Sequence, residues 1–461
     1  MRYRLKVADR DFRELARLAT EHLPKEAAVF GLVGVNQHGD TTDILVRRVI
    51  AVPIEAYDEQ LTYHLEISPR AVNGLASLAE ANGLGVLLCH CHGDESTYSP
   101  SDDFGERRVF GTLRAFMPPE APTVSLLFRA DGLQGRVWLP GSGRSVAMDE
   151  VVVIGRSIER HMFGPTKAVA PLDPALDRQV LAFGEDGQHA ISASRIGVVG
   201  TGGTGSAVTE QLVRLGVRDL VLIDPDGWDP TNITRVYTTV PSQAGDDRTK
   251  VARVADGLRR IAPLARIQAI ASSVVLDTAA ASLVDRDVIF LCTDDHWGRS
   301  VVNQLAYQYL IPTLNLGVRM DATDGEISGA SGTVDVLRPD VPCLWCRQAL
   351  RSERIAAESL PRSARSQLQR EGYVEGLDTP APSVISLNTV VAGLAVTQFL
   401  QLLTDFMGAP GEIERMRYDP LNGIVHRGRT MPPDDCLCRQ VRGFGNLKGL
   451  PVKSDLSFLE R

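Results

Sequence analysis

A glycine-rich turn constrains what this chain can fold into more than any other feature. Residues 195–199 form a short, mostly apolar segment, glycines follow at positions 200, 202, 203 and 205, and a helical pattern begins near Ala207. Glycines at this spacing let the backbone turn tightly and bring phosphate groups close to the N-terminus of a helix. Asp219–Ile223 predicts the next strand, which ends at Asp224. Because strands and helices alternate in this way from about residue 175, we expect a parallel sheet.

The residues after this unit favour a triphosphate over a hydride carrier as the ligand. A G-x-G-x-x-G turn followed by an acidic strand end is equally typical of NAD enzymes, in which the acidic residue binds the ribose. Here the chain continues with Asn232, Arg235 and Lys250, and a further strand ends at Asp294. Arginine and lysine neutralise phosphate charge, and a carboxylate holds magnesium, so this set is suited to ATP.

This half of the chain resembles the ubiquitin-activating, E1-like family typified by ThiF, MoeB and HesA. The matching residues run from Arg178-Gln179 and the segment 183–188, through the glycine turn and Asp224-x-Asp226, to Asp294. The resemblance covers nearly all of residues 175–440. It implies a Rossmann-like, mostly parallel sheet that adenylates the C-terminal glycine of a ubiquitin-like protein.

The resemblance also implies roles for individual residues. The residues expected at ATP are Gly200, Gly202, Gly203, Gly205, Asp224, Asp226, Asn232, Arg235, Lys250 and Asp294. Within this set Asp224 would hold the ribose and Asp294 would hold Mg²⁺, while Asn232, Arg235 and Lys250 would contact phosphates. Arg178 matches an arginine that family members contribute across a homodimer. We therefore expect a homodimer, with Arg178, Arg235 and Lys250 as catalytic residues.

Four cysteines predict a structural zinc site in the same half. Cys343 and Cys346 form a C-x-x-C pair, and Cys436 and Cys438 form a shorter C-x-C pair far downstream. Four thiolates make a closed tetrahedral site, and the E1-like family often carries two cysteine pairs at these places. The alternative is a set of ordinary reduced thiols.

Many E1-like enzymes form a thioester on a cysteine within the segment that here spans residues 347–400, and this segment has no cysteine. We hypothesise adenylation without a thioester on this chain.

The N-terminal third carries a second pattern of metal ligands. An apolar strand from Gly85 ends in His90-Cys91-His92, and residues two apart on a strand face the same side. Asp102 follows ten residues after the second histidine. Two imidazoles and one carboxylate leave the fourth position of a zinc ion open for water, which is typical of a hydrolytic site.

Together with Glu26, these residues resemble the JAMM (JAB/MPN) metalloprotease motif over roughly residues 10–150. The resemblance implies three zinc ligands, His90, His92 and Asp102. It also implies that Glu26 is the general base and that Ser99 helps to stabilise the oxyanion. This chain departs from the motif in two ways: Gly93 stands where the family usually has proline, and the loop to the aspartate is one residue short, which makes Asp103 an alternative ligand.

Composition and charge exclude several other classes of protein. The chain has 461 residues, 44% of them hydrophobic and 23% charged, which excludes disordered and fibrous classes. A net charge of −8 argues against a nucleic-acid-binding protein. No apolar run reaches the roughly 18 residues of a membrane span, and Val390–Leu403 is expected to be a core helix. Because the N-terminus also lacks the pattern of a signal peptide, we expect a cytoplasmic protein that does not contact membranes.

The combined interpretation is an α/β protein with two catalytic domains. Residues 1–160 form a JAMM/JAB-like α+β metalloprotease domain, 161–174 a linker, and 175–461 an E1-like adenylation domain with the four-cysteine zinc site. We expect a bifunctional enzyme of a prokaryotic ubiquitin-like pathway that uses ATP, Mg²⁺, one catalytic Zn²⁺ and one structural Zn²⁺. Its first domain would process a ubiquitin-like tail or an isopeptide bond, and its second would adenylate the exposed glycine.

The expected partner is a ubiquitin-like or sulfur-carrier β-grasp protein with a C-terminal glycine. An E2-like protein or a sulfur-transfer protein would be the acceptor. One alternative is an adenylyltransferase for a sulfur carrier in which the JAMM half serves only for docking. A non-catalytic scaffold and an NAD oxidoreductase are the remaining alternatives.

Overall fold

The computed structural model of the chain describes residues 1–94, 96–164, 171–240, 248–371, 382–431, 433 and 435–457. Two compact units make up the chain. Unit 1 comprises Met1–Ala168, Gln308–Leu310 and Val441–Gly449, and unit 2 comprises Val169–Tyr307, Ile311–Gln440 and Leu450–Arg461. Residues 165–170 of the predicted linker lie outside the described residues. The sequence placed all of 175–461 in one domain, whereas two short segments of that range belong to unit 1.

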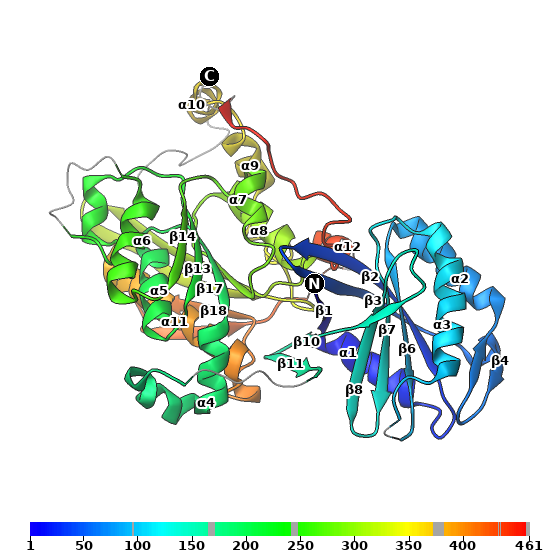
Figure 1. The fold of residues 1–461 in the computed structure, drawn as a ribbon. Coiled ribbons are helices and arrows are strands. Elements are labelled where there is room, and N and C mark those ends of the chain that lie inside the picture. The colour runs from blue at the N-terminus through cyan, green and yellow to red at the C-terminus, as the bar shows by residue number, and fades with distance from the viewer. Residues whose placement is uncertain are drawn as a thin grey trace. The chain divides into compact units, whose positions relative to one another are not determined.

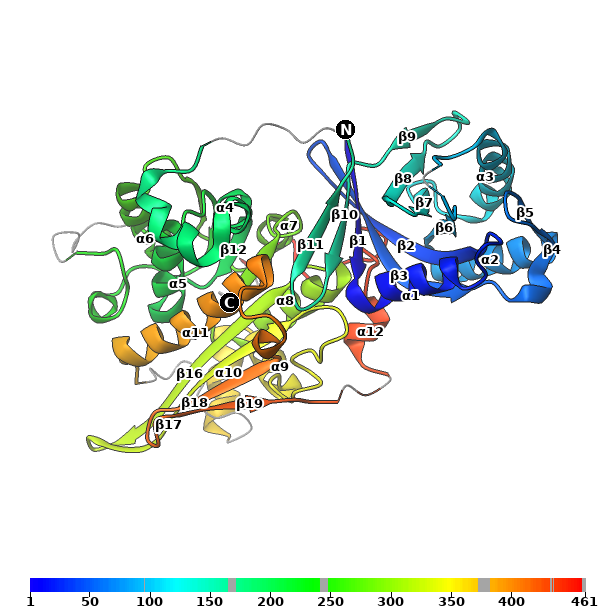
Figure 2. The ribbon, with the colours of Figure 1, turned by 90° about the horizontal axis from the view of Figure 1, so that it is seen from below.

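Unit 1 is built on a mixed sheet of nine strands over the described residues (Figures 1 and 2). In spatial order the strands are β11 (Ile158–Met162), β10 (Glu150–Ile154), β1 (Arg2–Ala8), β3 (Thr41–Ala51), β2 (Ala28–His38), β6 (Gly85–Cys91), β7 (Thr123–Arg129), β8 (Gly132–Trp138) and β9 (Ser145–Ala147). A separate hairpin pairs β4 (Tyr57–Gln60) with β5 (Leu65–Ile67). Strand β1 is parallel to β3 and β10, β6 is parallel to β7, and the other neighbours are antiparallel.

Helices cover both faces of this sheet. They are α1 (Asp9–Thr20), α2 (Pro69–Asn82) and α3 (Pro100–Leu113). On β6, Leu87 and Cys89 pack in the core cluster of α1, whereas Val86 and Leu88 pack in the cluster of α2 and α3. Because side chains alternate along a strand, His90 belongs to the α2–α3 face. The cysteine neighbours of His90 therefore point into the opposite core.

A fully buried group of charges lies on β1 and β3. Asp43 accepts a hydrogen bond from Arg4 Nε at 2.6 Å, and Lys6 Nζ and His38 Nε2 lie 3.0 and 3.1 Å from its second oxygen. Burial alone would raise the pKa of Asp43, but Lys6, His38 and Arg4 outweigh it and hold the pKa well below its ordinary value. The carboxylate therefore stays ionised and compensates the buried cations.

Unit 2 is built on a sheet of eight strands over the described residues, and the first five of them are parallel. In spatial order they are β14 (Arg266–Ile270), β13 (Asp219–Ile223), β12 (Arg195–Val199), β15 (Val288–Leu291), β16 (Thr313–Thr323), β17 (Glu326–Leu337), β18 (Arg415–Asp419) and β19 (Ile424–Gly428). Nearly every residue of β12, β13 and β15 is buried, as expected for parallel strands that are covered on both faces. This architecture confirms the predicted Rossmann-like sheet.

The helices of unit 2 include one long apolar helix. The helices are α4 (Asp177–Ala193), α5 (Gly203–Arg214), α6 (Lys250–Ile261), α7 (Asp277–Ala281), α8 (His296–Gln308), α9 (Ser352–Glu358), α10 (Arg362–Arg370), α11 (Ile385–Thr404) and α12 (Leu437–Val441). By length and composition α11 is sufficient to cross a membrane, which the sequence interpretation had excluded for every segment. However, 56% of its most apolar window is buried, and it packs against α5, β16 and β17. The packing confirms the expected core helix.

Candidate functional sites

The glycine turn after β12 has no room for side chains at three of its positions. Gly200 has a φ of +89°, a conformation that favours glycine. A Cβ atom at Gly205 would lie 1.9 Å from the carbonyl oxygen of Gly200, and one at Gly203 would lie 2.2 Å from Nδ2 of Asn388. Helix α5 begins at Gly203, so its first N–H groups are free of intrahelical partners. The result is a tight backbone cradle at a helix N-terminus, which suits a phosphate group.

Asp224, directly after β13, ties the turn to the next loop. Its buried carboxylate accepts hydrogen bonds from the N–H and the hydroxyl of Thr201 at 2.7 and 3.0 Å, and from the N–H of Asp226 at 3.0 Å. Lys250 Nζ lies 3.4 Å from Asp224 and 2.6 Å from Asp226. Burial would lower the pKa of Lys250, but the two aspartates outweigh it and raise the pKa, so the ammonium stays charged. The structure thus brings Asp224, Asp226 and Lys250 together, and their roles toward ribose and phosphate stay predictions.

Arg235 and Asn232 form a second polar group next to the turn. Arg235 follows a short 3-10 helix over Pro230–Thr234 and donates from Nη2 to Oδ1 of Asn232 at 3.3 Å. Its Cδ would lie 3.6 Å from a Cβ atom at Gly203, so the arginine borders the start of α5. Asn388, from the first turn of α11, borders the same glycine and donates to Oγ of Ser383 at 3.1 Å. Arg235 therefore lies beside the cradle and carries Asn232 as its hydrogen-bond partner, and the roles of both toward phosphate stay predictions.

Asp294 and Arg178 have no contact with these groups among the described residues. Asp294 is exposed and follows β15, which pairs in parallel with β12, so it lies at the same sheet edge as the glycine turn. One carboxylate together with substrate phosphates is a usual environment of Mg²⁺, so this residue type and place fit the ion. Arg178 is exposed on α4. Its role across a homodimer stays a prediction.

The four predicted zinc cysteines converge in unit 2. Their sulfur atoms all lie within 4.8 Å of one another, with Cys436 Sγ 3.0 Å from Cys346 and 3.5 Å from Cys343. Four thiolates bound to zinc at about 2.3 Å would lie roughly 3.8 Å apart, so the cluster fits such an ion. Helix α8 anchors the first pair, because Asn303 Oδ1 accepts a hydrogen bond from the N–H of Leu344 at 2.9 Å.

The predicted ligands His90, His92 and Asp102 also converge, in unit 1. Asp102 Oδ1 lies 3.4 Å from Nε2 of His90, and Oδ2 lies 3.5 Å from Nε2 of His92. Nε2 of His90 is buried and makes no hydrogen bond of normal geometry among the described residues. Buried polar atoms are rarely left without a partner. An unpaired imidazole nitrogen that faces a carboxylate and a second imidazole therefore fits a metal ion.

The structure distinguishes between the two aspartates that were candidate ligands. Asp102 is the third residue of α3 and forms a capping box with Ser99, whose N–H donates to Oδ2 of Asp102 at 2.6 Å. Asp103 instead contacts Arg136 on β8 and lies outside the ligand cluster. The alternative prediction, that Asp103 is the ligand, is therefore wrong. The capping box fixes the start of the helix and directs Asp102 to the histidines. Ser99 serves as the helix cap, and its oxyanion role stays a prediction.

Glu26 lies beside this cluster, in the loop before β2. Its Oε1 is 3.8 Å from Nε2 of His92, and only 6% of the residue is exposed. Burial raises the pKa of Glu26, and the neighbouring His90 and His92 offset part of the effect. On the other side of the ring, Nδ1 of His92 lies 2.9 Å from Oγ of Ser96, which leaves Nε2 for a ligand. A carboxylate with a raised pKa is suited to accept a proton near neutral pH.

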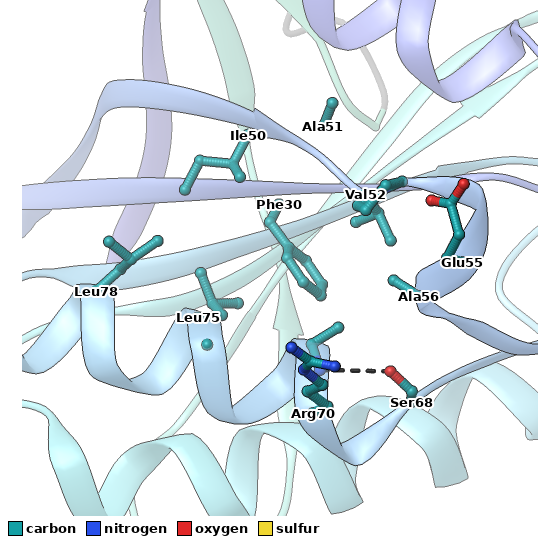
Figure 3. Close-up of a pocket in the computed structure, with 13 residues that line it drawn as sticks. Phe30, Ile50, Ala51, Val52, Glu55, Ala56, Ser68, Arg70, Leu75 and Leu78 are labelled. Atoms are coloured by element: carbon teal, nitrogen blue, oxygen red, sulfur yellow. Dashed lines mark hydrogen bonds between the residues drawn. The ribbon is translucent and has the colours of Figure 1, made fainter.

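A cavity of about 360 Å³ opens at the cluster. Its walls come from β5, α2 and α3, and they include the largely exposed aromatic residues Tyr63 and Phe104. A second cavity of about 360 Å³ is shown in Figure 3, where Phe30, Leu75 and Leu78 give it an apolar lining. Among the described residues the second cavity contains no group of metal ligands. Of these two cavities, the first is therefore the one that borders the predicted metal ligands.

The sequence analysis did not identify four residues that take part in these sites. Thr201 and Asn388 contact the glycine turn or its surroundings, and Ser96 and Arg136 contact residues of the histidine cluster or of its helix. Thr201 stands between Gly200 and Gly202, at a position where the glycine motif specifies no residue. Its hydroxyl group was the one available signal. Asn388 and Arg136 reach their sites by tertiary packing alone.

Comparison with known proteins matches the ThiF family to residues 176–440. Ubiquitin-like modifier-activating enzyme 5 of Drosophila ananassae is 27% identical over 282 residues, which cover 57% of this chain and 64% of that protein. This chain therefore spans less than two thirds of the length of that relative. Molybdopterin-synthase adenylyltransferase of Escherichia coli strain K12 is 32% identical over 182 residues, which cover 38% of this chain and 68% of that protein.

A crystal structure of E. coli MccB with AMPCPP and MccA aligns with 57% of this chain and 73% of that chain, at 15% identity and a TM-score of 0.46. The family match, in contrast, spans more than half of the chain and includes both the glycine turn and all four clustered cysteines. This chain belongs to the ThiF family.

Proposed function

We propose that this chain is a bifunctional enzyme of a prokaryotic ubiquitin-like pathway. One unit would hydrolyse the bond that follows the terminal glycine of a ubiquitin-like protein, either in an extended tail or in an isopeptide linkage, and the other would adenylate the glycine carboxylate so exposed. The observation that carries the first activity is the unpaired Nε2 of His90 within the cluster of His92 and Asp102. Membership of the ThiF family and a relative that is an adenylyltransferase support the second activity.

In the proposed adenylation, the terminal carboxylate attacks the α-phosphorus of ATP. An oxygen–phosphorus bond forms, the bond from the α-phosphorus to the bridging oxygen breaks, and pyrophosphate leaves with the electron pair. Two anions must approach each other, so the barrier falls when positive charge lies beside them and both are held in place. Lys250 and Arg235 supply this charge next to the glycine cradle. Mg²⁺ at Asp294 would add charge compensation at the phosphates.

In the proposed hydrolysis, His90, His92 and Asp102 would hold Zn²⁺ beside the cavity of about 360 Å³. The ion would polarise the scissile carbonyl and acidify water. Glu26 would take the proton of the attacking water and pass it to the leaving amine. Burial raises the pKa of Glu26, which makes its carboxylate a stronger base for this proton transfer.

The partners follow from this chemistry. We expect a β-grasp protein with a C-terminal glycine as the substrate and an E2-like or sulfur-transfer protein as the acceptor. Residues 347–400 have no cysteine, so the adenylate would pass directly to that acceptor. Homodimerisation through Arg178 and a cytoplasmic location complete the proposal.

An alternative for unit 1 is a docking module without protease activity. Gly93 and the short loop before Asp102 depart from the JAMM motif and favour this alternative. The zinc content of the purified chain separates the two cases. About two zinc ions per chain support both sites, and about one supports the four-cysteine site alone.

The test is ATP–pyrophosphate exchange with a panel of β-grasp proteins that end in Gly-Gly, each with and without extra C-terminal residues. Exchange on mature tails that is lost in Lys250→Ala would establish adenylation. Exchange on extended tails that requires Glu26, tested with Glu26→Ala, would establish that hydrolysis precedes adenylation. If no tail supports exchange, the proposed adenylation of ubiquitin-like tails is wrong.

A further inference from the structure

A buried polar network joins strand β8 to helix α3, which carries Asp102. Nε of Arg136 on β8 donates to Oε2 of Glu106 on α3 at 3.0 Å, and Nε1 of Trp138 donates to the same oxygen at 2.6 Å. Arg136 also contacts Asp103, the residue after Asp102. Two adjacent turns of the helix are therefore bound to one strand.

The network lies one helical turn from the aspartate of the metal cluster. Glu106 follows Asp102 by four residues, so both side chains lie on the same face of α3. Glu106 and Arg136 are 6% and 7% exposed. A buried ion pair is a weak source of stability because desolvation offsets its attraction, but in some proteins such a pair fixes the relative placement of two elements. Here the placement that it fixes is that of the helix start with Asp102.

The same arginine also supports the histidine side of the cluster. Its guanidinium lies 3.8 Å from the ring centroid of Tyr98, and the Tyr98 ring meets the His90 ring at 64° with centroids 6.0 Å apart. Oγ of Ser125 lies 3.2 Å from the Tyr98 hydroxyl and 3.3 Å from Nε of Arg136. Arg136 is thus connected to Asp102 through helix α3 and to His90 through the Tyr98 ring.

From these contacts we infer that Glu106 and Arg136 are positioning residues of the metal centre. Their ion pair holds Asp102, and through Tyr98 also His90, at the separation in which both bind one ion. The inference rests on the zinc site of the proposed function and adds residues that do not touch the metal. Removing a direct hydrogen-bond partner of a metal ligand typically weakens metal binding by about 10- to 100-fold, and Glu106 and Arg136 act on the ligands one step further out, through α3 and Tyr98.

The test is a Co²⁺ titration of the metal-free full-length chain and four variants, of which Asp102→Ala removes a proposed ligand. Thiolate ligands give charge-transfer absorption that imidazole and carboxylate ligands lack, so the two clusters are read separately. Glu106→Ala is expected to weaken binding at the histidine cluster about 10- to 100-fold and to leave the four-cysteine site unchanged. Glu106→Gln keeps an acceptor oxygen for Arg136 and Trp138 and is expected to regain most of the affinity. Glu80→Ala, an exposed change on α2, is the control and should match the unchanged chain.

The outcomes separate this inference from the proposed function. If the unchanged chain and Asp102→Ala give the same titration, the zinc centre itself is wrong, and the inference falls with it. If the unchanged chain binds at both clusters and folded Glu106→Ala binds equally well, only the inference is overturned. Equal weakening at both clusters would also overturn it, because it would indicate general destabilisation. Should Glu106→Ala fail to fold, Arg136→Lys replaces it, since lysine keeps the charge but loses the planar stacking and the fixed donor geometry.

Discussion

Replacing Gly205 with alanine will strain or displace the glycine turn after β12. The new Cβ atom would lie 1.9 Å from the carbonyl oxygen of Gly200 and 2.9 Å from its carbonyl carbon. The shorter contact is more than about 1 Å below the normal separation of nonbonded atoms. Both Gly200 atoms belong to the backbone, so no side-chain rotation relieves the overlap. The turn must therefore either bear the strain or move away from α5.

The two responses set the size of the effect. Overpacking costs about 1–3 kcal/mol, and the upper end applies because only the backbone can yield. If the strain remains, the free energy of unfolding falls by about 3 kcal/mol, which lowers Tm by roughly 6–12 °C. If the turn moves by about 1 Å, misplacement of the phosphates lowers the rate about 100-fold. We expect at least one of these losses, measured by thermal unfolding and by ATP–pyrophosphate exchange.

Gly202→Ala is the matched control for stability. A Cβ atom at Gly202 meets no atom within 4 Å, and the φ of −71° is open to alanine. Its Tm should therefore equal that of the unchanged chain. Loss of exchange at an unchanged Tm would then place the phosphates against residue 202 itself. If Gly205→Ala keeps both the Tm and the exchange rate, the turn is not constrained as described, and the steric argument is refuted.

Three further predictions concern the other clusters. Asp43→Asn removes the carboxylate that faces the buried Lys6 and Arg4, although Arg4 also lies 3.8 Å from Glu150, and it should lower the free energy of unfolding by about 3 kcal/mol in urea titrations. Folding lowers the pKa of Asp43. The stabilisation from its carboxylate is therefore complete above the unfolded pKa of about 4 and is lost as the pH falls through the folded pKa. The difference in the free energy of unfolding between the unchanged chain and Asp43→Asn should shrink in acid. Asp102→Asn should weaken metal binding far more than Asp103→Asn in the Co²⁺ titration, and equal effects would contradict the assignment. Cys436→Ser should lower Tm and remove one zinc per chain, and an unchanged zinc content would exclude the four-cysteine site.

Local patterns predicted the elements that carry the sites. The segment Asp219–Ile223 was predicted as a strand and is β13 in the structure, because a run this short, flanked by a helix and a polar segment, has the length of a buried strand. His90 and His92 could be paired from spacing alone, since alternation along a strand is a property of the backbone. The same holds for Cys343 and Cys346, which share one loop.

Contacts between distant elements were not predictable in this way. Asn388 reaches Gly203 across 185 positions of the sequence, and only the packing of α11 against α5 brings them together. Arg136 reaches α3 from β8 for the same reason. The segment Val441–Gly449 joins unit 1, because Asn446 N–H donates to the carbonyl of Val35 at 2.6 Å and Gly445 forms a parallel bridge with Val35 on β2. Spacing along the chain carries no information about these pairs.

The two candidate metal sites differ in the feature that separates structural from catalytic metal sites. Four sulfur ligands complete a tetrahedron and leave no position for a substrate, so the ion at Cys343, Cys346, Cys436 and Cys438 would only stabilise the fold. Three ligands leave one position open, and at His90, His92 and Asp102 that position would adjoin a cavity and the buried Glu26. Graded removal of zinc should therefore act in two ways: loss from the cysteines should lower Tm, and loss from the histidines should abolish hydrolysis with a smaller change in Tm.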